Sequence, residues 1–206
     1  MSKWNEIWNL KAIDCSNHDI INGFTHCENN IDSKELFNYL VDINNIEKHE
    51  SILEFGCGSG RIGQYFINND YNYSGLDRSE NMIKTFKKLL NTKNIYQIND
   101  LSLPFESNSF DVIICYSVVQ YLSNLDEFTF LLNEMIRVSK RIIYIGDIES
   151  IDHTNNNNKY YIHQSELKHL IINKEYIKNL NLKYAINIDS LFCSRNSRYN
   201  CIIKII

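Results

Sequence analysis

The stretch that decides the fold of this chain lies at residues 51–63, which read Ser51-Ile52-Leu53-Glu54-Phe55-Gly56-Cys57-Gly58-Ser59-Gly60-Arg61-Ile62-Gly63. Residues 52–55 predict a short buried strand, and residues 61–68 predict a helix. The glycines between them predict a tight turn, because glycine has no Cβ atom and readily adopts a positive φ. Such a turn presents backbone N–H groups and a helix N-terminus to a ligand. In an open α/β sheet it also lies at the edge where ligands bind.

Outward from this turn, expected strands and helices alternate along the chain. Further strands are expected at 72–77, 94–98, 110–115 and 141–146, and helices at 33–46, 80–90, 126–139 and 165–172. The alternation predicts a parallel sheet with helices on both faces. Residues 182–188 and 199–206 read as two last strands with no helix between them, which predicts an antiparallel hairpin. The expected sheet therefore has seven strands and is mostly parallel.

The bulk composition excludes several classes of protein. The chain has 206 residues and a formal net charge of −4, which gives no support for a nucleic-acid partner. It has no apolar run long enough to span a membrane, and no apolar segment typical of a signal peptide follows Met1. The six cysteines show no close metal-type spacing, and they read as reduced thiols. We therefore expect a cytoplasmic protein with no metal site.

The glycine turn admits two interpretations. Residues 58–63 match the pattern G-x-G-x-x-G, and Asp77 follows at about the distance expected for an acid that binds a ribose. On that pattern alone, an oxidoreductase that uses NAD(P) is possible. Glu54 argues against it, because a carboxylate beside a pyrophosphate would be repelled, whereas a carboxylate suits a cationic ammonium group.

Four segments in order carry a resemblance to a known family. They are the motif Glu54-x-Gly56-x-Gly58-x-Gly60, the tripeptide Asn99-Asp100-Leu101, the run 103–113 into a strand, and the final hairpin. Together they resemble the class I S-adenosylmethionine-dependent methyltransferases, most clearly over residues 46–146. The resemblance implies a Rossmann-like fold, with S-adenosylmethionine as cofactor and S-adenosylhomocysteine as product.

The resemblance also implies roles for residues at the cofactor site. Glu54 would organise the amino group of the methionine moiety, and Asp77 would accept hydrogen bonds from both ribose hydroxyls. Asp100 would accept from the adenine amino group. The other expected cofactor-binding residues are Gly56, Cys57, Gly58, Gly60, Arg61, Arg78, Ser79, Met82, Leu101, Tyr116 and Ser117.

The acceptor side is expected in the segments after the fourth strand. An alcohol acceptor would need a general base, for which the candidates are Asp147, His153 and His163. A phosphate or carboxylate acceptor would instead need positive donors, which a cationic patch of Arg195 and Arg198 could supply. The residues expected to bind the acceptor are Trp8, Gln120, Tyr121, Tyr160, Tyr161, Arg195 and Arg198.

These observations predict one methyltransferase domain over residues 1–206. A helical cap (1–48) would precede the cofactor-binding core (49–147), and a lid, a helix and the hairpin (148–206) would form the acceptor side. The expected reaction is methylation of oxygen or nitrogen on a small polar acceptor, such as a sugar or a phosphorylated or carboxylated metabolite. The alternatives are an NAD(P)-dependent oxidoreductase and a catalytically silent partner subunit that binds the cofactor.

Overall fold

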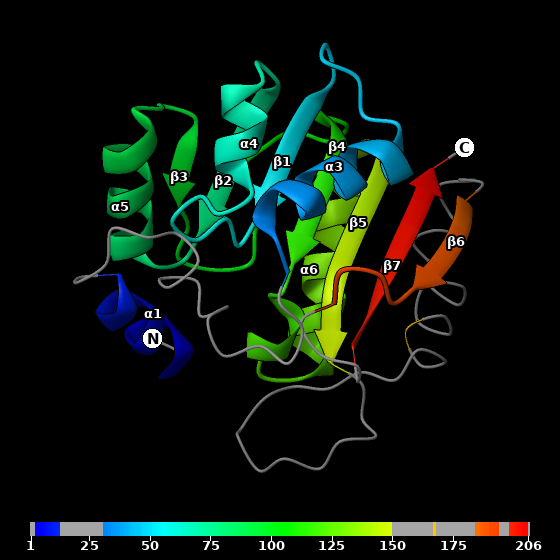
Figure 1. Ribbon diagram of the computed structural model, residues 1–206. Helices are drawn as coiled ribbons and strands as arrows, with labels where there is room; N and C mark the ends of the chain where they lie inside the picture. Colours follow the sequence, from blue (N-terminus) through cyan, green and yellow to red (C-terminus); the bar gives the residue numbers. More distant parts are fainter. Residues whose placement is uncertain (1–2, 13–30, 150–166, 168–183, 194–197, 206) are drawn as a thin grey trace.

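A twisted sheet with helices on both faces forms the centre of the molecule (Figure 1). The computed structural model describes residues 3–12, 31–149, 167, 184–193 and 198–205. The helices are α1 (Lys3–Lys11), α3 (Ser33–Asn44), α4 (Gly63–Asn68), α5 (Glu80–Leu90), the short 3-10 helix η2 (Val119–Tyr121) and α6 (Leu125–Val138). The strands are β1 (Ser51–Phe55), β2 (Asn72–Asp77), β3 (Ile95–Gln97), β4 (Phe110–Tyr116), β5 (Ser139–Glu149), β6 (Tyr184–Asp189) and β7 (Arg198–Ile205).

The seven strands run in the order β3-β2-β1-β4-β5-β7-β6. The first five are parallel, and β7 is antiparallel to both β5 and β6. The predicted mostly parallel sheet with an antiparallel C-terminal pair is therefore confirmed. In the register of the sheet, Glu54 of β1 lies opposite Gly75 of β2 and Ile114 of β4. The glycine turn after β1 consequently lies beside the ends of its two neighbours.

Two hydrophobic cores cover the two faces of the sheet. Alternate side chains of β1 enter them: Ile52 packs with residues of α3, α4 and α5, whereas Leu53 packs with residues of α6. Both side chains are fully buried. A strand buried on both faces explains why Ile52, Leu53 and Phe55 are all apolar, because neither face of β1 meets water.

Helix α4 and strand β5 differ from their expected bounds in ways that the structure explains. Helix α4 begins at Gly63, because residues before it remain in the turn, where the Gly60 N–H donates to the carbonyl of Cys57. Strand β5 is longer than expected at both ends, because Ser139 pairs with Phe110 of β4 and Glu149 pairs with Arg198 of β7. The pairing contains an irregularity between Ile145 and Ile148, and Asp147 within it has φ 58°. The expected helix at 165–172 lies outside the described residues except for Leu167.

Arg198 is placed differently from the sequence-based expectation of an exposed cationic patch. Its Nε donates to Glu149 at 2.7 Å and its Nη1 donates to Asp147 at 2.5 Å. The three side chains are 5%, 4% and 0% exposed. Burial opposes the charged form, but the two carboxylates more than offset it and raise the pKa of Arg198. This arginine therefore joins β7 to β5 inside the protein, and Arg195 lies outside the described residues.

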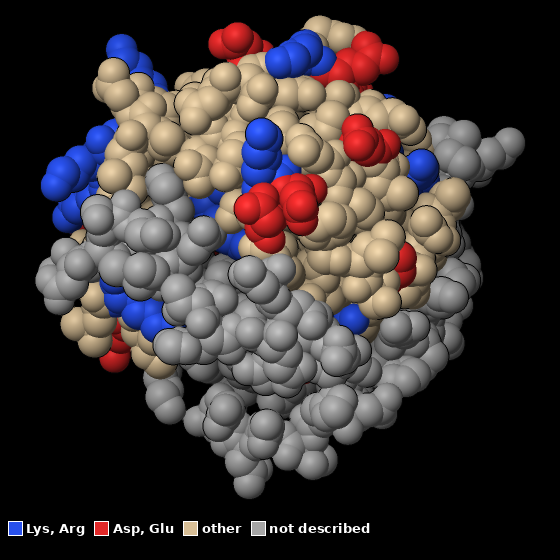
Figure 2. Space-filling view, in the orientation of Figure 1, with Lys and Arg blue, Asp and Glu red and all other residues tan. Residues whose placement is uncertain are grey.

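Positive side chains gather along the edge of the molecule formed by α5 (Figure 2). Lys84, Lys87 and Lys88 of this helix are all exposed. None of the helices in the described ranges is long and apolar enough to cross a membrane. Within the same ranges, no three His, Cys, Asp or Glu side chains lie close enough together to hold a metal ion.

Replacement of Arg198 by alanine should destabilise the protein strongly, because it would remove the cation between two buried carboxylates. We expect the free energy of unfolding to fall by about 3–5 kcal/mol, measured by chemical denaturation. Lys140→Ala is the matched control, because Lys140 pairs with Asp111 at 3.1 Å while its side chain is 45% exposed. That variant should lose about 0–1 kcal/mol. Equal losses for the two variants would contradict a structural role for Arg198.

Candidate active site

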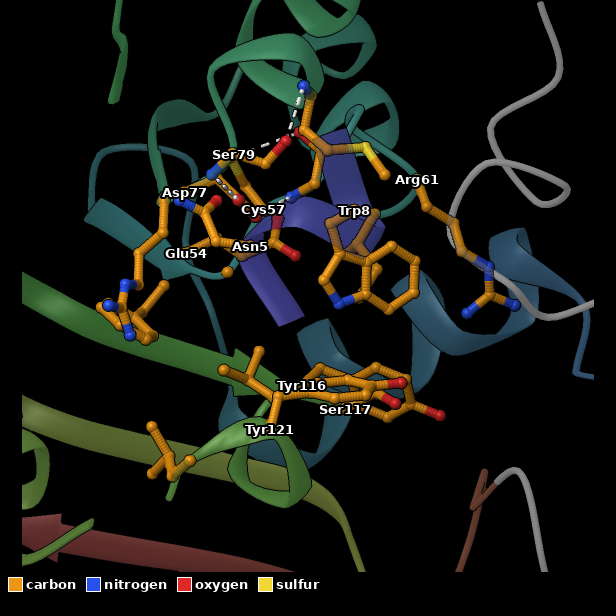
Figure 3. A pocket seen from close by; sticks show the side chains of 18 of the residues that line it. Asn5, Trp8, Glu54, Cys57, Arg61, Asp77, Ser79, Tyr116, Ser117 and Tyr121 are labelled. Carbon is orange, nitrogen blue, oxygen red and sulfur yellow. Dashed lines mark hydrogen bonds between the residues drawn. The ribbon is translucent and has the colours of Figure 1, made fainter. Parts of the chain in front are cut away.

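A pocket of about 960 Å³, part of it open to solvent, lies at the carboxyl ends of β1, β2 and β4 (Figure 3). Twelve of the fourteen residues expected to bind the cofactor line it. They are Glu54, Gly56, Cys57, Gly58, Arg61, Asp77, Arg78, Ser79, Met82, Leu101, Tyr116 and Ser117.

The glycine turn has a conformation that few other residues could adopt. Gly56, Gly58 and Gly60 have φ values of 77°, 53° and 97°. A Cβ atom on Gly56 would lie 2.3 Å from Cγ2 of Val118, and one on Gly60 would lie 2.9 Å from the ring of Phe86. Gly56 therefore lets the segment after β4 approach the turn, and Gly60 lets α5 pack against it.

Asp77 connects the end of β2 to this turn. One carboxylate oxygen accepts from the Gly58 N–H at 2.9 Å, and the other accepts from the Ser79 N–H at 2.8 Å. Burial raises the pKa of Asp77, and these backbone hydrogen bonds act in the opposite direction. Ser79 also caps α5, because its hydroxyl accepts from the Met82 N–H at 3.2 Å. The carboxylate is thus held in a fixed orientation at the pocket wall.

Glu54 is a buried acid on the pocket floor, with an exposed fraction of 3%. Burial raises the pKa of its carboxyl group from the usual 4.5 to about 8. The hydrogen bond from the Tyr73 hydroxyl and the nearby Arg61 guanidinium lower it, whereas Asp77 adds to the rise. Glu54 is therefore largely protonated at neutral pH, and a cation placed beside it would favour the ionised form.

Two of the expected cofactor residues do not line the pocket. Gly60 acts in the packing of the turn, as described above. Asp100 is exposed, and its carboxylate accepts from the Ser102 N–H at 2.8 Å. The chain turns after the short strand β3 and brings the neighbouring Leu101 to the pocket instead.

The residues expected to bind the acceptor or to act as a base lie in different parts of the structure. Trp8 and Tyr121 line the pocket, with ring centroids 5.4 Å apart in an edge-to-face arrangement. Gln120 is fully buried and does not line it; its Nε2 donates to the hydroxyl of Ser117 at 2.9 Å. Asp147 is held by Arg198 as described above and does not line the pocket either. The remaining candidates, His153, Tyr160, Tyr161, His163 and Arg195, lie outside the described residues.

Sequence reasoning missed several of the residues that line the pocket: Asn5, Phe55, Ile62, Val118 and Leu122. Most of them are immediate neighbours of predicted residues, so an apolar lining could have been expected there. The spacing of Asn5 from Trp8 could also have predicted its place in the pocket. Asn5 lies three residues before Trp8 in the expected N-terminal helix, and residues three apart share a helix face.

Comparison with known proteins identifies the class to which this fold belongs. Residues 53–142 match a family described as a methyltransferase domain. The magnesium protoporphyrin IX methyltransferase of Synechocystis has a similar structure, with a TM-score of 0.60 over 99% of this chain and 91% of that one at 15% identity. The chain therefore has the Rossmann-like fold of class I methyltransferases, and its residues 53–142 are similar to the methyltransferase-domain family.

Curated relatives match shorter parts of the chain. The 18S rRNA (guanine(1575)-N(7))-methyltransferase of Saccharomyces cerevisiae is 33% identical over 88 residues, which are 42% of this chain and 32% of that protein. The ubiquinone biosynthesis O-methyltransferase of Rickettsia bellii is 30% identical over 117 residues, which are 55% of this chain and 45% of that protein. The chain thus spans less than half the length of either relative.

Glu54 should make the stability of the ligand-free protein depend on pH. Its folded pKa of about 8 lies above the unfolded value of 4.5, so its stabilising contribution is complete below pH 4.5 and is lost as pH rises through 8. Glu54→Gln keeps an acceptor for Tyr73 but cannot ionise. Relative to wild type, the variant should gain stability on the order of 3 kcal/mol between pH 5 and 9, measured by denaturation. A pH-independent difference would contradict the burial of an ionisable Glu54.

Proposed function

We propose that this chain is an S-adenosylmethionine-dependent methyltransferase that binds its cofactor in the pocket beside the glycine turn. The observation that carries the proposal is the buried carboxyl group of Glu54 on the pocket floor, next to a turn that Asp77 holds in place. A buried acid that faces a cavity favours a ligand with a positive charge at that point. The ammonium group of S-adenosylmethionine supplies such a charge.

The pocket residues suit the other parts of the cofactor. The carboxylate of Asp77 suits the ribose hydroxyls, because each of its oxygens can accept another hydrogen bond besides the one it receives from the backbone. Arg61, a buried cation of the same pocket, suits the methionine carboxylate. Met82 and Leu101 offer an apolar surface for the adenine ring.

Catalysis in such a site depends mainly on placement. S-adenosylmethionine, when bound, would supply a methyl group on a positively charged sulfur, which is already a good leaving group. Tyr116 ends β4 and Ser117 follows it at the pocket wall, where they could orient the reacting end of the cofactor. The rings of Trp8 and Tyr121 would exclude water from that end. Orientation and desolvation by these residues can account for much of the rate enhancement.

The oxidoreductase interpretation fits the pocket less well. A pyrophosphate at the glycine turn would lie near Glu54 and Asp77, and both acids would have to stay protonated to avoid repulsion. Arg61 and Arg78 of the same pocket would attract an anion, but a ligand with an ammonium group needs neither acid to stay protonated. The silent-subunit interpretation predicts cofactor binding without turnover on any acceptor, which an activity panel would test.

We further propose a small acceptor with a polar oxygen or nitrogen nucleophile that enters beside Trp8 and Tyr121. The relatives above are named for ribosomal RNA and for ubiquinone biosynthesis, so they do not favour one acceptor class. The preference for an anionic acceptor loses its support from Arg198, because that cation is buried against two carboxylates. His153 and His163 as bases, Tyr160 and Tyr161 as pocket residues, and a cytoplasmic location stay predictions.

Calorimetry should detect binding of S-adenosylhomocysteine, and Asp77→Ala should weaken it. Loss of a charge-assisted contact costs about 1.5–3 kcal/mol, which corresponds to roughly 10- to 100-fold in the dissociation constant. Asp111→Ala removes an acid that lies at the start of β4, far along the strand from the pocket, and should leave binding unchanged. Binding of NAD with no binding of S-adenosylhomocysteine would overturn the proposal.

Cofactor binding should release a proton from Glu54 near pH 7. The ligand's ammonium would lower the raised pKa of this acid, so the group would pass from mainly protonated to mainly ionised. The binding enthalpy should then vary with the ionisation enthalpy of the buffer, with about one proton released per site at most. Glu54→Gln should abolish this dependence. A wild-type enthalpy that is the same in phosphate and Tris buffers would contradict it.

A further inference from the structure

Helix α1 forms one wall of the cofactor pocket and turns two of its side chains toward it. Asn5 and Trp8 both line the pocket, and Figure 3 shows them with Asp77 and Ser79 around the same cavity. The sequence assigned only Trp8 to this region, and only to the acceptor. Asn5 therefore lies in the pocket wall without a role that the sequence predicted.

The side-chain oxygen of Asn5 is a buried acceptor that has no hydrogen-bond partner among the described residues. A buried polar atom without a partner destabilises the protein, so such atoms usually find one. The atom belongs to a residue of the pocket wall, so a ligand in the pocket can supply the missing donor. This distinguishes Asn5 from the surface residues of α1.

Asn5 is positioned by the hydrogen bonds that Asn9, one turn further along α1, makes with Ser79 and Asn81. The side-chain oxygen of Asn9 accepts from the Ser79 hydroxyl at 2.7 Å and from the Asn81 N–H at 3.2 Å. Asn81 in turn donates to the carbonyl of Asn9 at 2.9 Å. Residues four apart lie on the same face of a helix, so Asn5 lies next to this connection on the same face as Asn9.

The connection brings α1 to the part of the pocket that is suited to a ribose. Ser79, which donates to Asn9, also donates its backbone N–H to Asp77. Among the described residues, the apolar cluster at this end is small: Trp8 and Ala12 of this segment pack against Met82 of α5. The hydrogen bonds of Asn9 therefore decide much of how α1 is placed over the pocket.

We propose that Asn5 is a cofactor-binding residue that accepts a hydrogen bond from a ribose hydroxyl, and that Asn9 is the positioning residue that holds it there. The assignment rests on the proposed function, because the ribose belongs to the proposed cofactor. A hydroxyl is the donor that the neighbourhood of Asp77 and Ser79 favours. With Asp77 on β2 and Asn5 on α1, the ribose would be held from two elements that are distant in sequence.

Two features of the chain make the proposal easy to test. Both tryptophans of the protein, Trp4 and Trp8, lie in α1, so intrinsic fluorescence reports on this helix alone. 5′-Methylthioadenosine keeps the adenine and ribose of the cofactor but lacks its amino-acid part. A contact to the ribose should therefore affect this compound and S-adenosylhomocysteine equally.

The experiment measures binding of both compounds to wild type and to Asn5→Leu, by calorimetry and by tryptophan fluorescence. The variant has similar size without a polar atom, and it should weaken both ligands by about tenfold. Leu10→Ala is the matched control, because Leu10 is on the same helix and is 69% exposed; it should bind as wild type does. Asn9→Ala should weaken both ligands and speed amide hydrogen exchange in α1, which a purely local effect of Asn5 would not do.

The outcomes separate this inference from the proposed function. Wild-type affinity in Asn5→Leu would overturn the role of Asn5, even though S-adenosylhomocysteine binds. Weaker binding of S-adenosylhomocysteine alone would overturn the ribose assignment, because the contact would then be to the amino-acid part. Failure of the wild-type protein to bind S-adenosylhomocysteine would overturn the proposed function itself.

Discussion

The hydrogen bond from the Gly58 N–H to Asp77 is the contact on which the rest of the site depends. It joins the turn after β1 to the end of β2, the neighbouring parallel strand. The turn can take this shape because Gly56 and Gly60 adopt positive φ values and leave room for Val118 and Phe86. Together with the hydrogen bonds that the Gly56 and Cys57 N–H groups donate to the Leu76 carbonyl, this contact holds the floor and one wall of the pocket in place.

The protein compensates the negative charge of its buried acids in two different ways. Near the ends of β5 and β7, Arg198 stands between Asp147 and Glu149, so those charges meet an opposite charge within the fold. On the pocket floor, burial instead raises the pKa of Glu54, whose described contacts include a hydroxyl hydrogen bond. The first arrangement joins two strands. The second leaves an acid that gains most from a cationic ligand, which is why Glu54 is central to the proposed function.

The N-terminal helix extends the site beyond the strands and the glycine turn at its centre. It is connected to α5 through Asn9 and to η2 through the ring contact of Trp8 with Tyr121. Within the described part of the chain, this wall of the pocket belongs to a small apolar cluster separate from the two main cores. A wall held mainly by hydrogen bonds can respond to a ligand more readily than a wall held by a large core.

The sequence by itself determined the sheet, its helices and the core of the site. Alternating strands and helices depend on local hydrophobic patterns, and the glycine turn, Glu54 and Asp77 follow from motifs at the ends of strands. These features need no knowledge of distant contacts, because parallel strands bring their carboxyl ends to one edge. Twelve of the fourteen expected cofactor residues accordingly line the pocket.

Only the tertiary structure decided the direction of single side chains. Arg198 meets Asp147 across 51 residues of chain, and Asn9 meets Ser79 across 70. A charged or polar residue can pair with any of several partners at such separations, and packing selects among them. For this reason an arginine expected at the surface is buried, and an asparagine with no assigned role lines the pocket.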